Sequence, residues 1–358
     1  MDGGLSISPM AGSSPPNNAR RVAQAFSLCV AQAFSLCFAQ GLQPQPSGVT
    51  ASLRGISAVN TNVAYASGAQ GTILKTTDGG ITWSRIGPAG VANIDFRDIE
   101  AVNERLIFAM SAGDGPLSRV YKSTDGGASW SLARINGEQG FWDAIAFWDE
   151  GHGILMGDPV NGRFTILTTA DGGRSWQPRE GPRAERGEAA FAASGTALVV
   201  RGAREAWFAT GGAGGARVFH SEDGGATWAA AKTPVRAGSD GAGIFSLAFN
   251  GRYGIAVGGD YTKPEEAASN WAVSEDGGRS WKAGGGTGPR GYRSAVAHDA
   301  AAGVWIATGP AGTEWSRDGR TFQPVEGEGY HALGFAADGS GWGVGPEGRI
   351  ARFVFLAQ

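Results

Sequence analysis

"STDGGASW", residues 123–130, is the stretch that decides the fold, because it recurs along the chain. Four further full copies and one shortened copy are "TTDGGITW" (76–83), "TADGGRSW" (169–176), "SEDGGATW" (221–228), "SEDGGRSW" (274–281) and "SRDGRTF" (316–322). Their spacing, about 40–50 residues, is typical of a solenoid, a propeller or an array of repeats.

The residues between two copies indicate which of these architectures is present. Residues 53–86 contain four short apolar runs, at 53–59, 63–66, 72–76 and 81–86, separated by Asn, Gly and Asp-Gly-Gly. This pattern predicts a four-stranded antiparallel meander, and no run has a sustained helical period. Four strands in each repeat, arranged radially, form the blade of a β-propeller.

The recurring box therefore has a structural interpretation. It lies between the third and fourth strands of each blade, where Asp-Gly-Gly favours a tight turn with positive φ and the Asp side chain can bond nearby backbone N–H groups. A calcium loop would need several spaced carboxylates, whereas each box has one dependable Asp. We expect the box aspartates to be turn residues, namely Asp78, Asp125, Asp171, Asp223, Asp276 and Asp318.

The number of blades follows from the boxes and the two ends of the repeat region. Six boxes give six blades, and residues 330–355 supply three strands of a seventh. Residues 42–50 precede the first inner strand and can supply the missing outer strand, which would close the ring and remove an exposed edge. The prediction is an all-β, seven-bladed propeller formed as one domain by residues 41–358.

The box and several longer stretches resemble a known family. The pattern Ser/Thr-x-Asp-Gly-Gly-x-Ser/Thr-Trp is similar to the Asp-box, or BNR, repeat of bacterial sialidases and many other propellers. With "FRDIEAV", "FWDAIAFWD", "GIAVGGDY" and "GWGVGPEGRIARF", the chain after about residue 42 resembles the photosystem II stability/assembly factor-like family, within the WD40/YVTN/BNR-like propellers. The resemblance implies a non-enzymatic scaffold that holds a partner protein.

Residues 1–40 differ in composition from the repeats. A polar segment, expected to be disordered, ends at Arg20 and Arg21, and an apolar stretch follows in which AQAFSLC occurs twice, at 23–29 and 31–37. This order resembles a secretory signal peptide cleaved near Ala39. We expect export to the periplasm or the extracellular space. An uncleaved membrane anchor and a cytosolic protein are the alternatives.

Composition excludes several classes of partner and cofactor. The 30 basic and 33 acidic residues are balanced, without a basic run, so nucleic acid is not an expected partner. Both cysteines, Cys29 and Cys37, lie before residue 40, and the four histidines fall in different repeats. We therefore expect no metal site and no cofactor, since no dinucleotide fingerprint follows a strand either. A monomer is expected.

Binding is expected where the inner strands begin, around the central channel. Seven stretches align there: 54–59, 97–102, 142–147, 188–193, 244–249, 293–298 and 330–335. The first two positions of the aligned stretches are rich in charged residues. The insertion at 258–266 and Asp158 are expected to lie beside these positions. The predicted binding residues are Arg54, Arg97, Asp98, Trp142, Asp143, Glu188, Arg293, Tyr330 and His331.

Two classes of function fit these residues. The first is a scaffold whose arginines bind a protein partner or a small anionic ligand through carboxylates. The second is a sialidase-like or other glycoside hydrolase that uses Glu188 and Tyr330 as its catalytic pair beside the arginines. The Phe/Tyr-Arg-Ile-Pro motif of sialidases is absent, and seven blades replace their six, so the scaffold is favoured.

Overall fold

The computed structural model describes residues 1–4 and 41–355. The chain divides into two units, residues 1–40 and 41–358. The expected signal peptide lies outside the described residues. Within the described part, no helix has the length and apolar character needed to span a bilayer.

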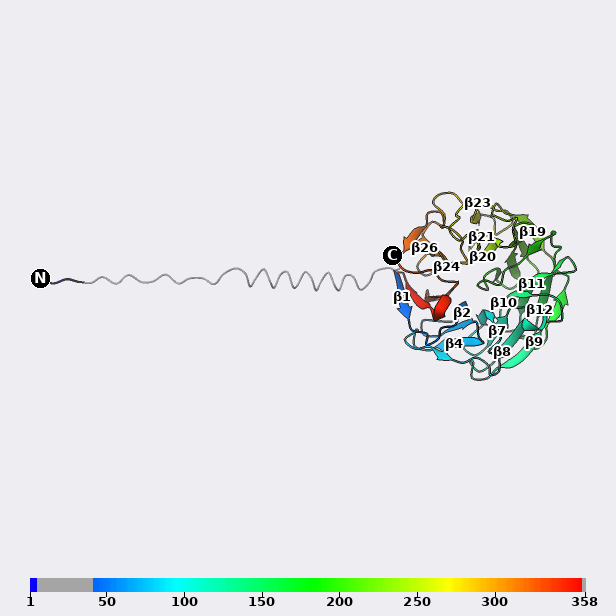
Figure 1. The fold of residues 1–358 in the computed structure, drawn as a ribbon, viewed down its shortest axis with the longest axis horizontal. Coiled ribbons are helices and arrows are strands. Elements are labelled where there is room, and N and C mark those ends of the chain that lie inside the picture. Colours follow the sequence, from blue (N-terminus) through cyan, green and yellow to red (C-terminus); the bar gives the residue numbers. More distant parts are fainter. Residues whose placement is uncertain (5–40, 356–358) are drawn as a thin grey trace. The chain divides into compact units, whose positions relative to one another are not determined.

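The second unit is a seven-bladed β-propeller, as the repeats predicted. Seven antiparallel sheets follow one another around a ring, six of them four-stranded and one extended to six strands. In Figure 1 the strands β2, β10, β20 and β24 lie toward the centre of the ring, while β9, β19 and β23 lie toward its rim. The first strand of each blade thus lines the axis, and the fourth strand is the outermost.

Blade 1 consists of β2 (Leu53–Ala58), β3 (Ala64–Gly68), β4 (Thr72–Thr76) and β5 (Ser84–Arg85). Blade 2 consists of β6 (Phe96–Ala101), β7 (Ile107–Ser111), β8 (Arg119–Ser123) and β9 (Ser131–Ile135). Blade 3 consists of β10 (Trp142–Phe147), β11 (Gly153–Val160), β12 (Arg163–Thr169) and β13 (Gln177–Arg179). Blade 4 consists of β15 (Leu198–Arg201), β16 (Glu205–Ala209), β18 (Arg217–Ser221) and β19 (Ala229–Lys232).

Blade 5 consists of β20 (Ala242–Asn250), β21 (Tyr253–Asp260), β22 (Trp271–Ser274) and β23 (Lys282–Ala283), extended by β14 (Glu188–Ala189) and β17 (Gly211–Gly212). Blades 6 and 7 consist of β24 (Ala295–Asp299), β25 (Val304–Gly309), β26 (Gly312–Ser316) and β27 (Gln323–Val325); and β28 (Ala332–Phe335), β29 (Gly341–Val344), β30 (Ile350–Val354) and β1 (Gly41–Gln45). Two short 3-10 helices are η2 (Gly115–Leu117) and η3 (Pro346–Gly348).

The box turns bond to themselves. In the second blade the Ser123 hydroxyl donates to Asp125 Oδ1 (2.8 Å) and accepts from the Gly127 N–H (2.8 Å). The Ser129 N–H and hydroxyl donate to the two oxygens of Asp125, at 2.8 and 2.5 Å. Gly126 and Gly127 have φ of 74° and 90°, a region that favours glycine. The same hydroxyl-to-aspartate bond occurs in the other five boxes, at Asp78, Asp171, Asp223, Asp276 and Asp318.

The N-terminal strand of this unit lies against the last blade. β1 pairs antiparallel with β30, from Gly41 opposite Val354 to Gln45 opposite Ile350. The strand lies earlier than the predicted segment 42–50, because residues 46–52 form the connection into β2. Gln45 Oε1 accepts from the indole N–H groups of Trp342 (3.1 Å) and Trp83 (3.2 Å), one in the last blade and one in the first.

Blade 4 departs from the sequence prediction. Residues 188–193 were expected to form its inner strand, but that strand is β15, Leu198–Arg201. The earlier stretch has the small and apolar composition of a buried strand, which is why the pattern was misleading. In the structure it is a buried loop with a two-residue strand, β14, attached to the sheet of blade 5.

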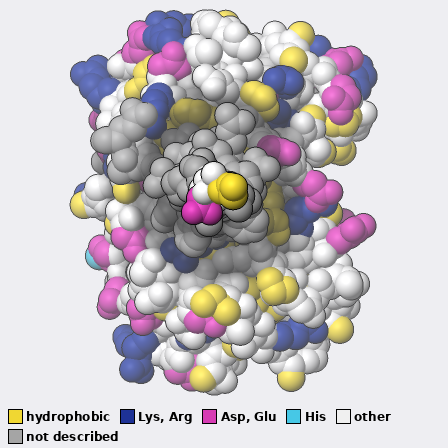
Figure 2. All heavy atoms as spheres, turned by 90° about the vertical axis from the view of Figure 1, so that its left-hand side faces the viewer, with side chains coloured by type: hydrophobic (Ala, Val, Ile, Leu, Met, Phe, Trp, Pro, Cys, Tyr) yellow, Lys and Arg dark blue, Asp and Glu magenta, His cyan; other side chains and the backbone are white. Residues whose placement is uncertain are grey.

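Surface charge follows the balanced composition. On the part of the face that Figure 2 presents in colour, basic and acidic side chains are interspersed.

Candidate binding site at the channel mouth

Each of several inner strands begins with a buried residue followed by a β-bulge. The pairing register shifts between Leu53 and Gly55 in blade 1, and between Phe96 and Asp98 in blade 2. The same shift occurs at the start of β10 and within β20. A bulge places two residues opposite one and re-aims the side chain of the extra residue. The residues re-aimed are Arg54, Arg97, Asp143 and Phe245.

These four side chains line one cavity of about 530 Å³. Ser294 and His331 line it from blades 6 and 7. Ser294 in blade 6 is equivalent to Arg54 in blade 1. The residue before each of them makes the same hydrogen bond, because its N–H donates to a carbonyl at the end of the second strand of the preceding blade. These bonds run from Leu53 to Gly345 and from Arg293 to Gly258. The cavity is thus built from the corresponding position of six blades, and we call it the mouth cavity.

The buried loop of blade 4, residues 190–197, reaches four other blades at this cavity. Ala192 O accepts from Arg97 Nη1 (3.0 Å), and the Ala190 N–H donates to Asp158 Oδ1 (2.8 Å). Ser194 Oγ donates to Ser294 O (2.9 Å), and the rings of Phe191 and Phe245 stack with centroids 4.0 Å apart. Residues 190–193 line the cavity, so the loop forms one wall of it.

Two arginines give the mouth cavity its positive side. Arg97 pairs with Asp95 (Nε–Oδ2 2.6 Å). Arg54 is half-buried, and among the described residues no carboxylate oxygen lies within 4.0 Å of its guanidinium. Burial, followed by the charge of Arg97, lowers the pKa of Arg54. An arginine remains charged under these conditions, so Arg54 is available to an anion.

His331 does not add to that positive charge. Its Nδ1 lies 3.0 Å from Leu53 O. Burial and the neighbouring Arg54 lower the pKa of His331 to about 4, so the ring is neutral at pH 7 and supplies polarity only.

Two carboxyl groups lie in the same cavity as the arginines. Asp143 is 1% exposed, and its Oδ2 has no hydrogen-bond partner among the described residues. Burial, followed by the charge of Asp158, raises the pKa of Asp143 well above its usual range. Burial also raises the pKa of Asp158. A buried oxygen without a partner is costly, so a ligand donor or a water would be bound favourably there.

The remaining wall of the mouth cavity is aromatic. Phe245 packs edge-to-face on Tyr292 (4.8 Å between centroids) and on Tyr261 (6.2 Å). Tyr261 belongs to the insertion 258–266, which was expected beside the starts of the inner strands, and it is 54% exposed. An apolar surface beside a few polar groups is the usual composition of a small-molecule site.

Five predicted binding residues do not line this cavity, and all five are buried elsewhere in the fold. Glu188 is buried and accepts from Arg217 Nε (2.9 Å) and Thr210 Oγ1 (2.6 Å). Arg293 is 1% exposed and pairs with Glu314 (2.8 Å). The other three are Asp98, which accepts from the Ile145 N–H (2.8 Å), and the buried rings Trp142 and Tyr330.

The error was a one-residue shift of register in blades 3, 5, 6 and 7. The alignment matched Arg54 and Arg97 with Trp142, Arg293 and Tyr330, each of which is the buried residue one position before the cavity-lining residue of its blade. Aligning the bulky residues Leu53, Phe96, Trp142, Ile244 and Tyr330 would have given the observed register. The aromatic residues Phe191, Phe245 and Tyr292 were missed, because they read as core residues in the sequence.

Comparisons with known proteins agree with the fold and with the resemblance seen in the sequence. Residues 122–283 match the family described as "Photosynthesis system II assembly factor YCF48", and residues 74–85 match the BNR/Asp-box repeat. No curated protein sequence matches the chain.

Solved structures with a similar fold include the structure described as "YCF48 bound to D1 peptide", with a TM-score of 0.64 at 17% identity, covering 89% of this chain and 98% of that chain. YCF48 from Cyanidioschyzon merolae has a TM-score of 0.62 at 15% identity, covering 87% and 98%. The protein U3-55K has a TM-score of 0.61 at 12% identity, covering 88% and 98%. At these identities the likeness establishes the propeller fold, and the predicted resemblance to the assembly-factor family is confirmed.

Proposed function

We propose that this chain, an Asp-box propeller resembling the photosystem II assembly factors, is a protein-binding propeller that holds a peptide segment of a partner in the mouth cavity. The observation that carries the proposal is the juxtaposition of two groups in one cavity, Arg54 and Asp143. Within residues 41–355, Arg54 has no carboxylate partner and Asp143 Oδ2 has no hydrogen-bond partner. A peptide offers both complements, since a carboxylate can bind the guanidinium and an N–H can donate to the aspartate.

The aromatic wall supports a peptide over a simple anion. Phe191, Phe245, Tyr261 and Tyr292 offer an apolar surface to a side chain, and buried aromatic contacts supply much of the affinity in protein interfaces. The segment we infer is therefore short and contains a carboxylate next to a bulky apolar residue. One structural relative is described as bound to a D1 peptide, which makes that peptide a suitable first probe.

A hydrolase that uses Glu188 and Tyr330 has less support. Both side chains are buried, Glu188 is paired with Arg217, and neither lines the mouth cavity. Turnover of a glycoside by the wild-type protein, lost on Asp143→Asn, would favour a hydrolase that uses the mouth carboxyl groups instead.

Binding is tested with a panel of labelled peptides measured by fluorescence anisotropy. The panel includes a D1 peptide, acidic peptides with one aromatic residue, and matched peptides in which every carboxylate is an amide. We expect micromolar binding of acidic aromatic peptides, weakened by added salt and lost in the amide series. Equal binding of acidic and amide peptides would contradict the proposal.

We also propose that the protein is exported. The support is the sequence of residues 20–40, with an arginine pair before an apolar stretch. Mass spectrometry of the protein from its native cells should find a mature N-terminus near Gln40. A chain that retains its first residues in the cytosol would contradict export.

A further inference from the structure

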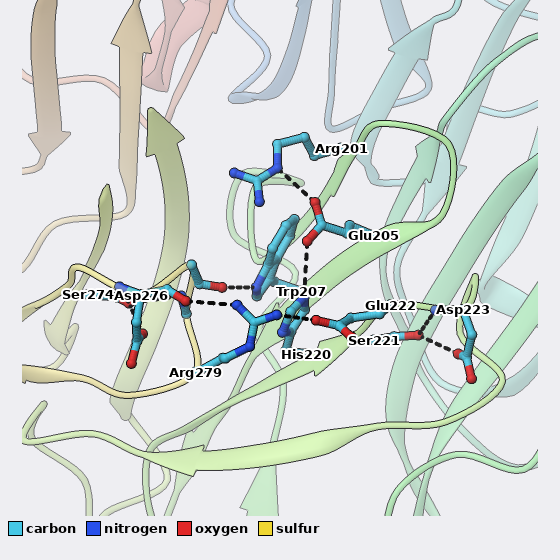
Figure 3. Close-up of polar contacts among 12 residues, drawn as sticks. Arg201, Glu205, Trp207, His220, Ser221, Glu222, Asp223, Ser274, Asp276 and Arg279 are labelled. Carbon is cyan, nitrogen blue, oxygen red and sulfur yellow. Dashed lines mark hydrogen bonds and ion pairs between the residues drawn. The ribbon is translucent and has the colours of Figure 1, made fainter. Parts of the chain in front are cut away.

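A cluster of potential metal ligands lies away from the mouth cavity, at the junction of blades 4 and 5. Glu205 begins β16, His220 lies in β18 on the neighbouring strand, and Glu222 follows β18 inside the Asp-box turn of blade 4. One ligand atom from each of the three lies within 4.8 Å of the others. Figure 3 shows the three side chains converging beside Trp207.

His220 is the central group of this cluster. It is 6% exposed, and its Nε2 has no hydrogen-bond partner among the described residues. The imidazole stacks on Trp207 with centroids 4.6 Å apart and planes 5° apart. Trp207 is itself fixed, because its indole N–H donates to Gly277 O (3.0 Å). The unsatisfied nitrogen is therefore held in one orientation.

The separation of the ligand atoms suits a bound ion better than a hydrogen bond. His220 Nε2 lies 3.6 Å from Glu205 Oε1, which is too long for a hydrogen bond. Two ligands that are each about 2.1 Å from a tetrahedral cation lie roughly 3.4 Å apart.

Each carboxylate keeps one oxygen for such an ion. Arg201 Nε donates to Glu205 Oε2 (2.9 Å), which leaves Oε1 facing His220. Arg279 donates to Glu222 Oε1 and leaves Oε2. A cavity of about 500 Å³, lined by His220, Glu222 and Arg279, gives access from solvent.

We propose that Glu205, His220 and Glu222 form a binding site for a divalent first-row transition-metal cation such as Zn²⁺. One imidazole and two carboxylates suit such a cation, whereas Mg²⁺ and Ca²⁺ prefer oxygen ligands alone. No metal site was expected from the sequence, because the four histidines lie in different repeats. One histidine is sufficient for the proposed site, because a hairpin and the turn after it bring two carboxylates beside it.

The next junction supplies a matched control. Glu275 holds the same box position in blade 5 as Glu222 in blade 4, and it pairs with Arg320 as Glu222 pairs with Arg279. The positions of Glu205 and His220 are taken there by Tyr253 and Val273. The carboxylate–arginine contact is thus present at both junctions, and the imidazole only at the first.

The experiment is calorimetric titration of ZnCl₂ into the full chain at pH 7, with Cys29→Ser and Cys37→Ser in every variant to remove thiol ligands. We expect one site that is weakened at least about tenfold by His220→Phe, which keeps the ring stack and removes the nitrogen ligand. Glu222→Gln should weaken it likewise. Controls are Glu275→Gln and His152→Ala, the latter because His152 lies beside Asp149 on the surface, and both should leave binding unchanged.

Arg279→Ala gives an effect of the opposite sign. Because Arg279 competes with the cation for Glu222, its removal should tighten Zn²⁺ binding, while Arg320→Ala should not change it. If His220→Phe fails to fold, Glu222→Gln and Arg279→Ala decide the question, since both side chains are exposed. Absence of binding in the wild type, equal affinity in Glu222→Gln, or loss only in His152→Ala would overturn the site.

Discussion

Aspartate has opposite environments in two regions of this propeller, the box turns and the mouth cavity. At Asp125, hydrogen bonds from the Ser129 hydroxyl and then from its backbone lower the pKa to about 2. At Asp143, burial raises the pKa well above its usual range. The oxygens of Asp125 accept hydrogen bonds from their own turn. Asp143 Oδ2 has no hydrogen-bond partner in the part of the chain that the structure describes. A saturated group stabilises the fold, and an unsaturated one is available to a ligand.

The repeats make the same distinction in another way. Six boxes carry the same hydroxyl-to-aspartate bond. The re-aimed position of the inner strands instead carries different residue types in different blades, namely Arg54, Arg97, Asp143, Phe245, Ser294 and His331. The box position holds the same residue type in six blades because it stabilises the turn of each blade. The re-aimed position of the inner strand differs from blade to blade, and it determines the chemistry of the mouth cavity.

The largest expected effect on stability concerns Arg293, which precedes the cavity-lining Ser294 in the chain but does not line the mouth cavity itself. Arg293→Ala removes the buried partner of Glu314 and leaves that carboxylate only its contacts with Arg290, whose Nε lies 3.3 Å from Oε1 and whose N–H donates to Oε2 (2.9 Å). The loss should cost about 3 kcal/mol of unfolding free energy, the lower end for breaking a buried ion pair. Urea denaturation measures the loss. Replacing both residues by apolar ones, as in Arg293→Met with Glu314→Leu, should recover most of it. A single variant with wild-type stability would mean that Arg290 alone compensates the buried Glu314.

Acid should act through the box turns. Partial burial opposes the shift at Asp223, Asp276 and Asp318, but hydrogen bonds still lower the pKa of all six box aspartates to about 2. Groups with a depressed folded-state pKa contribute stability above their unfolded pKa and lose it as pH falls through the folded one. The melting temperature should therefore fall steeply between about pH 4 and pH 2. A flat profile there would mean that the turn bonds contribute nothing.

A single box should have a smaller effect. Asp125→Ala removes the acceptor of three hydrogen bonds from Ser123 and Ser129 and should lower the melting temperature by a few degrees. Differential scanning calorimetry measures it, with Ala128→Ser in the same turn as a control that keeps the acceptor. An unchanged melting temperature would remove the structural role assigned to the box.

The smallest stability effect has the opposite sign. A carboxyl group whose folded pKa is raised costs stability as pH rises from its unfolded pKa to its folded one. Asp143→Asn removes this cost, so the variant should be slightly more stable than the wild type at pH 8 and not at pH 4. Paired melting curves at the two pH values test it. Destabilisation at both values would mean that Asp143 is satisfied within the fold.

The sequence predicted the parts of this molecule that are local. The box turn is decided within eight residues, so Asp125, Gly126 and Ser129 reveal it without knowledge of the rest of the chain. The lining of the mouth cavity depends on which residue of each inner strand lies at the bulge. The position of the bulge is set by the pairing of the inner strand with the second strand of its blade, which the local sequence does not reveal. Arg54 and Arg293 look equivalent in the sequence, yet one lines the cavity and the other is buried against Glu314.

The wall formed by residues 190–197 could not be predicted for the same reason. Its alanines and Phe191 have the composition of a buried strand, and only their contacts with Arg97, Asp158 and Ser294 from other blades make it a loop at the channel. Apolar composition predicts that a segment is buried, but it does not predict which other strands or blades the segment packs against.

The most direct test compares Arg54→Ala with Asp125→Ala for binding of an acidic aromatic peptide, measured by fluorescence anisotropy beside a melting curve. Arg54→Ala should weaken binding roughly tenfold to a hundredfold with an unchanged melting temperature, because it removes one charged hydrogen-bonding partner from an exposed cavity. Asp125→Ala should lower the melting temperature and leave binding intact. Arg134→Ala, an exposed arginine on β9, should change neither. If Asp125→Ala abolishes binding in a stable protein while Arg54→Ala binds normally, the box is the site and the mouth cavity is not.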